Sequence, residues 1–331
     1  MARLPTPRGP LSRALFEQLS ETVHDLDDVG EAHDDPLTGE DSALALYCCY
    51  ELHYRGFEGV DQGWEWEPSL LALRGRLEDR FLQSLRALVP LVTSADPSGV
   101  PGALRDLVGV PDRGPLTEFM GRRATLDQFC EFVVQRSAYH LKESDPHSWA
   151  IPRLSGRPKA ALVEIQGDEY GGGDPHRIHA TMYARLMERL GLDPTYGAYL
   201  DVISGVSLSA VNLMSFFGLH REFLGELVGH LAAFEMTSPL PNRKYANGLR
   251  RAGRGDALEF YEEHVEADAV HEQIAAHDLA GSLAEDEPAL APRILYGART
   301  LLAVDDLVGD HLLGAWNAGR SSLFEPLSLA V

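Results

Sequence analysis

Three side chains that can bind a transition metal share one face of a predicted helix, in the segment EFYEEHVEADAVHEQ. They are His264, Asp268 and His271, spaced by four and three residues. At 3.6 residues per turn, side chains at these spacings lie on one helix face. An ordinary amphipathic helix would present Leu, Ile or Val along such a stripe. Two imidazoles and a carboxylate suit iron, manganese or zinc, so the pattern favours a metal site inside a helical bundle.

Further acidic residues and one histidine stand in settings that are unusual for such side chains. Glu169 and His179 flank the glycine triplet at 171–173, and a break there lets both side chains point inward. Glu235 follows an apolar run near a helix end, where burial is costly and the helix dipole disfavours a carboxylate. Glu143 is the last residue of another predicted helix, where the helix dipole likewise disfavours a carboxylate. Together with the stripe, these residues provide four carboxylates and three imidazoles, which suffice for two metal ions.

The whole pattern resembles the haem-oxygenase-like diiron oxidases and oxygenases, a group often called iron-containing redox enzymes. The resemblance is carried by Glu143, by DEYGGG with a histidine ten residues after its glutamate, by Glu235, and by His-x₃-Asp-x₂-His over 264–271. It extends over about residues 120–310. It implies a seven-helix fold, a non-haem centre of two Fe(II) ions, and O₂ as co-substrate. Members of the group oxygenate amine or guanidine nitrogens, or cleave or desaturate amino acids and fatty acids.

The resemblance also implies a set of metal ligands. The group expected to hold mainly one iron is Glu143, Glu169 and His179. The group expected to hold mainly the other iron is Glu235, His264 and Asp268, with His271 completing the shell. Acids gathered without metal repel one another, so we expect residues around 260–275 to loosen in the metal-free protein. Asn212 and Ser215, which are polar residues inside AVNLMSFFGL, are candidate contacts for a small polar substrate.

Other interpretations of these residues stay open. A true haem oxygenase would use a proximal histidine, for which His140 is the candidate, but four nearby acids would then have no role. A thiaminase-like hydrolase would need a nucleophilic thiol, for which Cys130 is the candidate. A protein that binds or senses iron without O₂-dependent catalysis would use the same ligands as the enzyme. A solvated helix face would explain the stripe at 264–271 but none of the other acids.

Composition narrows the class of protein. The 331 residues carry a net charge of −21, which disfavours nucleic acid and anionic membranes as partners. No apolar run reaches the roughly 20 residues of a membrane span. The three cysteines stand in apolar settings, which argues against a disulfide scaffold, and the N-terminus lacks an apolar signal core. We therefore expect a cytoplasmic protein with a small-molecule substrate, and a homodimer is one option.

Nearly every periodic segment predicts a helix, so the expected fold is all-α, a haem-oxygenase-like multi-helix bundle with an N-terminal helical extension. We expect residues 1–115 to form the extension, packed on a metal-binding domain at 116–331. The expected helices occupy residues 11–24, 42–54, 67–93, 126–143, 158–170, 175–191, 195–217 with an interruption near Gly205, 219–236, 256–281 and 287–317. Thr125 and Gln128 predict a capping box at the start of one of them. Residues 95–116 are expected to be irregular, and SPLPN at 238–242 is expected to end a helix.

Overall fold

The computed structural model describes residues 2–109 and 114–326, without the side chains of residues 268 and 269. In these ranges the regular structure is helical, apart from one isolated bridge between Ala2 and Phe57. The prediction of an all-α fold is therefore confirmed. Among the described residues, no helix combines the length and the apolar composition that crossing a bilayer requires.

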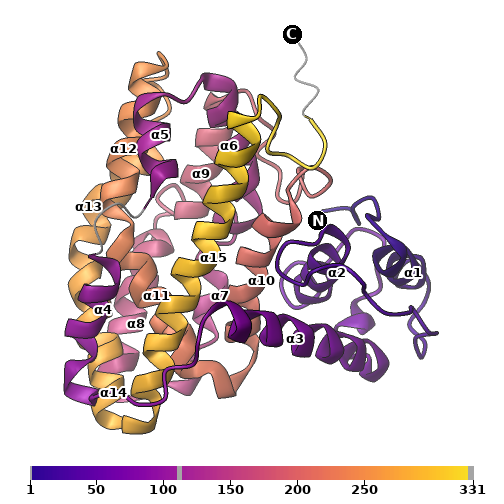
Figure 1. Ribbon diagram of the computed structural model, residues 1–331, viewed down its shortest axis with the longest axis horizontal. Coiled ribbons are helices and arrows are strands. Elements are labelled where there is room, and N and C mark those ends of the chain that lie inside the picture. The colour runs from indigo at the N-terminus through magenta and orange to yellow at the C-terminus, as the bar shows by residue number, and fades with distance from the viewer. Residues whose placement is uncertain (1, 110–113, 327–331) are drawn as a thin grey trace.

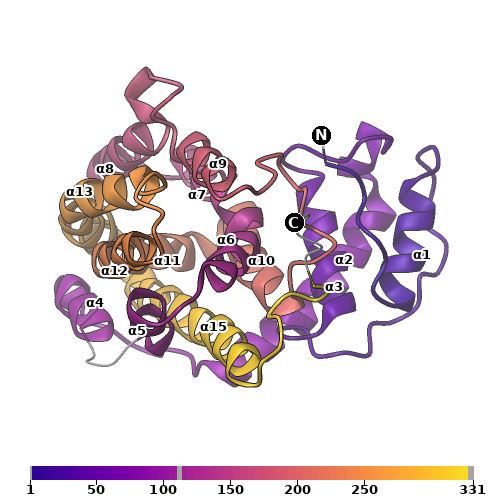
Figure 2. The same cartoon turned by 90° about the horizontal axis from the view of Figure 1, so that it is seen from above.

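The helices form a large bundle with a smaller N-terminal layer at its side (Figures 1 and 2). The layer, which we call the N-terminal layer, consists of α1 (Pro10–Leu19), α2 (Glu40–Glu51) and α3 (Pro68–Leu88). The main helices of the bundle are α6 (Leu126–His140), α8 (Gly156–Glu169), α9 (His179–Arg189), α10 (Gly205–Leu219), α11 (Leu224–Thr237), α13 (Glu259–Gln273) and α15 (Ala291–Asn317). Shorter or peripheral helices are α4 (Val100–Val108), α5 (Pro115–Arg122), α7 (Asp145–Ser148), α12 (Pro239–Arg251) and α14 (Ser282–Asp286).

The N-terminal layer meets the bundle mainly through α2, which packs along α10. Asn212 on α10 donates a hydrogen bond from Nδ2 to the carbonyl of Ala43, at 2.9 Å. The α4 helix lies within the range expected for the extension, yet it packs against α11 and α15 of the bundle. We therefore propose that the N-terminal unit ends after α3 and that α4 is part of the bundle.

Prolines that suggested breaks in the sequence instead begin helices. Pro101 lies in the first turn of α4, whose Val100 and Leu104 are buried, so the expectation of an irregular segment at 95–116 is wrong. SPLPN ends α11 at Thr237, as predicted, but Pro239 also begins a further helix, α12, that was not expected. A proline is tolerated at these positions because the first N–H groups of a helix have no partner within it.

Two predicted helices also have different ends. The predicted capping box is confirmed. Thr125 Oγ1 accepts a hydrogen bond from the Gln128 N–H at 3.2 Å, and Gln128 Oε1 accepts one from the Thr125 N–H at 2.9 Å. The helix that follows ends at His140, however, and residues 141–144 form a turn. The helix expected over 195–217 was predicted to be interrupted near Gly205. It begins at Gly205, because Ser204 caps it through Oγ, and residues 195–204 are not helical. Both boundaries are set by side-chain caps and turns rather than by apolar periodicity.

Two glycines allow α11 and α15 to touch backbone to backbone. A Cβ atom added to Gly229 would lie 1.8 Å from the carbonyl oxygen of Ile294, and one added to Gly297 would lie 2.0 Å from that of Glu226. Real Cβ atoms never approach a backbone oxygen so closely, so any larger residue would push the helices apart. This contact fixes the position of α11, which carries Glu235 at its C-terminal end.

We predict that Gly297→Ala lowers the free energy of unfolding by at least about 2 kcal/mol, because the new methyl group collides with the α11 backbone. The measurement is urea unfolding followed by circular dichroism. Gly314→Ala on the same helix is the matched control, since nothing lies within 4 Å of its added Cβ. The control should gain roughly 0.5–1 kcal/mol from helix propensity. Equal effects of the two substitutions would contradict the close helix contact.

Candidate metal centre

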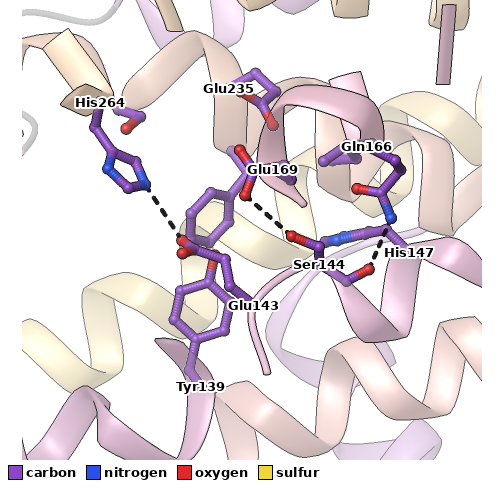
Figure 3. A pocket seen from close by; sticks show the side chains of 11 residues that line it. Tyr139, Glu143, Ser144, His147, Gln166, Glu169, Glu235 and His264 are labelled. Atoms are coloured by element: carbon purple, nitrogen blue, oxygen red, sulfur yellow. Dashed lines mark hydrogen bonds and ion pairs between the residues drawn. The ribbon is translucent and has the colours of Figure 1, made fainter. Parts of the chain in front are cut away.

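Six buried acidic and histidine side chains from five separate segments meet inside the bundle. Figure 3 shows four of them, Glu143, Glu169, Glu235 and His264. The segments are the turn after α6, the end of α8, the start of α9, the end of α11, and α13. The residues are Glu143, Glu169, His179, Glu235, His264 and His271. They fall into two groups of three, and in each group one potential ligand atom per residue lies within 4.8 Å of the others. We call these the first and the second ligand group.

The first ligand group consists of Glu143, His179 and His264. His264 Nδ1 lies 2.7 Å from the carbonyl oxygen of Phe260, which can only accept, so Nδ1 carries the proton. Nε2 then offers its lone pair toward Glu143 Oε1, 3.7 Å away. Glu143 Oε1 accepts hydrogen bonds from Tyr139 at 2.9 Å and from His140 Nδ1 at 3.0 Å. A neutral imidazole with its second nitrogen held by the backbone is the form that binds a metal ion.

The second ligand group consists of Glu169, Glu235 and His271. His271 Nε2 donates to Asp168 Oδ2 at 3.1 Å, because a carboxylate can only accept. This leaves Nδ1 facing Glu235 Oε2 at 3.4 Å. Asp168 is mostly exposed, so it lies outside the group and orients the ring from behind.

The two groups adjoin through Glu169 and His179. Glu169 Oε2 lies 3.1 Å from His179 Nδ1 of the first group. The same oxygen accepts a hydrogen bond from Ser144 at 3.0 Å. Glu169 therefore stands between the two groups, and the six residues form one continuous centre.

The buried carboxylates of the centre need cations to balance their negative charge. Glu143, Glu169 and Glu235 are all at least nine-tenths buried, and no Lys or Arg is found among the described residues that line their cavity of about 340 Å³. Burial alone would raise the pKa of Glu143, but the contact with His140 outweighs it and holds the pKa well below its usual range. Glu143 Oε2 is buried without a hydrogen-bond partner in the described part of the chain. Burying carboxylates in this way is costly unless cations balance them, and oxygen with imidazole donors suits iron.

Comparison with known proteins agrees with this chemistry. A sequence model described as iron-containing redox enzyme matches residues 130–306, a little over half of the chain. The chain belongs to the iron-containing redox enzyme family. It is also 26% identical over 181 residues to nitrosourea synthase of Streptomyces achromogenes subsp. streptozoticus. That alignment covers 53% of this chain and only 38% of the relative.

Membership of the iron-containing redox enzyme family confirms two predictions from the sequence. The protein is an oxidoreductase, and its all-α bundle has the haem-oxygenase-like fold. The family match begins within α6 and therefore leaves the N-terminal layer outside it.

The structure brings together six of the seven predicted ligands, but it divides them differently. His264 joins Glu143 and His179, and Glu169 joins Glu235 and His271. The expected division differs from these groups, because it kept Glu169 with His179 and placed His264 with Glu235, and the assignment of residues to each metal ion stays a prediction. His264 and His271 stand seven residues apart on α13, about 10 Å along the axis, so they face different parts of the centre. The side chain of Asp268 lies outside the described residues, and its role as a ligand stays a prediction.

Asn212 and Ser215 are not at the centre. Asn212 bonds the carbonyl of Ala43, and Ser215 Oγ accepts from the Tyr54 hydroxyl at 3.2 Å. Both therefore face the N-terminal layer, and neither lines the cavities next to the ligands. The expectation that they contact a substrate is wrong, because α10 is covered on both sides and its polar residues serve packing.

The structure also bears on the two alternative sites, a proximal histidine at His140 and a nucleophilic thiol at Cys130. His140 is buried among aromatic rings and uses Nδ1 to bond Glu143, so it supports the first ligand group. Burial raises the pKa of the Cys130 thiol to about 11, which leaves it protonated at neutral pH and disfavours a nucleophilic role.

Sequence patterns did not reveal several residues that support the centre. His147 and His230 are both buried, and their rings are joined by a hydrogen bond between His147 Nε2 and His230 Nδ1 at 3.1 Å. Burial lowers the pKa of His147 to about 4 and holds that of His230 well below its usual range. Tyr139, Asp168 and Ser144 likewise act through contacts that only the fold creates. The adjacency of Asp168 to Glu169 was the single hint in the sequence.

We predict that the metal-free protein loses stability as the pH falls from 7.5 to 5.5. An unfolded histidine takes up a proton near pH 6.5 whereas folded His147 does not, so stability declines below the unfolded pKa. His147→Gln should reduce this loss by about 1 kcal/mol in urea unfolding with a chelator present. His176→Gln, at an exposed position, is the control and should leave the pH dependence unchanged. An identical pH dependence in both variants would show that His147 is not buried and neutral.

Proposed function

We propose that this protein is a non-haem diiron enzyme that activates O₂ and oxidises a small organic substrate. The observation that carries the proposal is the pair of adjoining ligand groups, each with at least one carboxylate and one imidazole, with Glu169 between them. Glu143, His179 and His264 would hold one iron, and Glu169, Glu235 and His271 would hold the other, with Asp268 as a further ligand. Two Fe(II) ions bound there would supply the electrons that reduce O₂.

The chain's own residues prepare this chemistry. The Phe260 carbonyl and Asp168 each hold one ring nitrogen, of His264 and His271 respectively, so that the other nitrogen is aimed inward. Burial raises the pKa of Tyr139 well above its ordinary value, so its hydroxyl keeps its proton and donates to Glu143. Leu231 and Phe234 line the same cavity and exclude water from it. A dry, preorganised site of this kind limits side reactions of an activated oxidant.

Oxidation at nitrogen is the activity that we favour first. The relative's name denotes synthesis of a nitrosourea, and the relative is 26% identical to this chain over 181 residues. Oxidative C–C cleavage or desaturation remains the second activity to test. The net charge of −21 supports a small-molecule substrate over nucleic acid or an anionic membrane, and a cytoplasmic location is part of the proposal.

The decisive experiment is anaerobic loading with Fe(II), with iron counted per chain, followed by rapid mixing with O₂ under a visible spectrometer. We expect about two irons per chain and a transient absorbance after mixing. His264→Ala should lose at least one iron and the transient, because it removes a ligand of the first group. His176→Ala is the matched control, since this exposed histidine lies close in sequence to the ligand His179 but outside both groups.

Two outcomes would contradict the proposal. Binding of one iron or none, with no effect of His264→Ala, would mean that the buried residues do not form a diiron centre. Two bound irons without reaction with O₂, even with candidate amines present, would favour the alternative of an iron-binding protein without catalysis.

A further inference from the structure

A lysine and a glutamate form a fully buried ion pair between the N-terminal layer and the bundle. Lys142 Nζ lies 2.8 Å from Oε2 of Glu51, the last residue of α2, and both side chains are 0% exposed. The Tyr196 hydroxyl donates a hydrogen bond to the same glutamate oxygen at 2.7 Å. Lys142 Nζ also lies 4.8 Å from the ring centre of Tyr47 and 4.2 Å from that of Tyr54. The layer and the bundle together therefore enclose both charges.

Stability alone is a poor explanation for such a pair. Taking two charges out of water costs free energy that their attraction often does not offset, and apolar side chains of similar size are often as stable in the same place. A buried pair does fix two segments relative to each other, because separating them would leave each charge buried without a partner. Glu51 thus fixes Lys142 relative to α2, which packs along α10 of the bundle.

Lys142 belongs to a short turn, residues 141–144, which connects α6 to α7 and lies outside both helices. The N-terminal layer contacts this turn a second time, because Arg55 Nη2 donates a hydrogen bond to the carbonyl of Leu141 at 3.2 Å. The first half of the turn is therefore held by residues of the N-terminal layer.

The second half of the same turn belongs to the metal centre. Glu143 is a member of the first ligand group, and Ser144 donates a hydrogen bond to Glu169 of the second group at 3.0 Å. Glu143 follows Lys142 directly in the chain, so their Cα atoms are only about 3.8 Å apart. A displacement of Lys142 would therefore carry Glu143 with it and disturb both ligand groups.

We infer that Glu51 is a positioning residue for the metal centre and that it acts through Lys142. The ion pair holds the first half of the turn, and the turn in its second half places the Glu143 carboxylate and the Ser144 hydroxyl. Glu51 itself belongs to neither ligand group. This inference rests on the proposed function, since it requires that the centre binds metal ions.

The test removes both charges of the pair and examines the metal site of the folded protein. The double variant Glu51→Gln/Lys142→Met leaves neither charge unpaired, and the glutamine oxygen can still accept from Tyr196. Metal-free protein is titrated with Co(II) at a temperature well below its unfolding transition. Nearly all molecules are then folded, so a loss of global stability by itself changes neither the Co(II) affinity nor the visible spectrum at saturation.

We expect the double variant to bind Co(II) at least about tenfold more weakly than the wild type. Its visible spectrum at saturating Co(II) should also differ from that of the wild type, because a displaced Glu143 changes the geometry of the donors around the metal. A pair that serves only packing would change neither quantity.

The unfolding temperature, measured with a chelator and again with saturating Co(II), gives a further readout. A ligand that binds only the folded state raises this temperature by an amount that grows with its affinity. A positioning role predicts a smaller rise in the double variant than in the wild type at the same Co(II) concentration. A structural role predicts that the unfolding temperature falls equally with and without Co(II), so the rise stays the same.

Another ion pair at the opposite end of α2 provides the matched control. Arg8 pairs with Glu40, the first residue of α2, and Glu40 also accepts a hydrogen bond from the N–H of Gly205 at the start of α10. The variant Arg8→Met/Glu40→Gln removes this pair with the same kinds of side chain. It should lower the unfolding temperature and keep the wild-type Co(II) affinity, spectrum and temperature rise.

Three results would overturn the inference. Wild-type Co(II) affinity and spectrum in Glu51→Gln/Lys142→Met would mean that the pair serves packing alone. Changes of equal size in the Arg8→Met/Glu40→Gln control would mean that the centre depends on docking of the whole layer and not on Glu51. A wild-type protein that binds no Co(II) would refute the metal centre, and the proposed function with it, which distinguishes that failure from the other two.

A second version of the variant covers the case in which the first does not fold. Glu51→Met/Lys142→Met also removes both charges, and it fills the space of the pair with apolar side chains. It is judged by the same Co(II) affinity, spectrum and temperature rise. Altered values support the positioning role of Glu51, and wild-type values overturn it.

Discussion

The burial of three carboxylates at one point of an apolar bundle is the constraint on which the rest of the structure depends. Glu143, Glu169 and Glu235 repel one another, and water is largely kept from them. Such a cluster is stable only if cations balance it and if the surrounding groups hold each oxygen in place. The helix ends, the hydrogen bonds to Tyr139 and Ser144, and the close packing of α11 against α15 all serve this requirement.

Backbone interruptions bring the ligands to one place. Glu143 lies in a turn after α6, and Glu169 is the last residue of α8, separated by Tyr170 from the glycines at 171–173. His179 begins α9, and Glu235 lies in the last turn of α11. Side chains at helix ends can converge from different directions, which residues along one straight helix cannot do. Only α13 contributes ligands from its interior, and it supplies one to each ligand group.

The histidines show how contacts outside the ligand groups decide their chemistry. Phe260 and Asp168 fix which ring nitrogen of His264 and His271 carries the proton. Nδ1 of His264 and Nε2 of His271 are bound in this way, so the opposite nitrogens face the acids. The same fold that positions the rings therefore also decides which ring nitrogen is available to bind a metal ion.

The sequence alone determined whatever depends on local spacing and composition. Helical periodicity, the capping box at Thr125 and Gln128, and the shared face of His264 and His271 follow from 3.6 residues per turn. The tertiary structure decided which residues fall in which ligand group, because distance along α13 separates two residues that share a face. It also decided that Asn212 and Ser215 face the N-terminal layer, since α10 is buried on both sides and its pattern shows no polar face. Contacts between distant segments, such as Lys142 with Glu51 or His147 with His230, leave no periodic signal, because they arise only when the chain has folded.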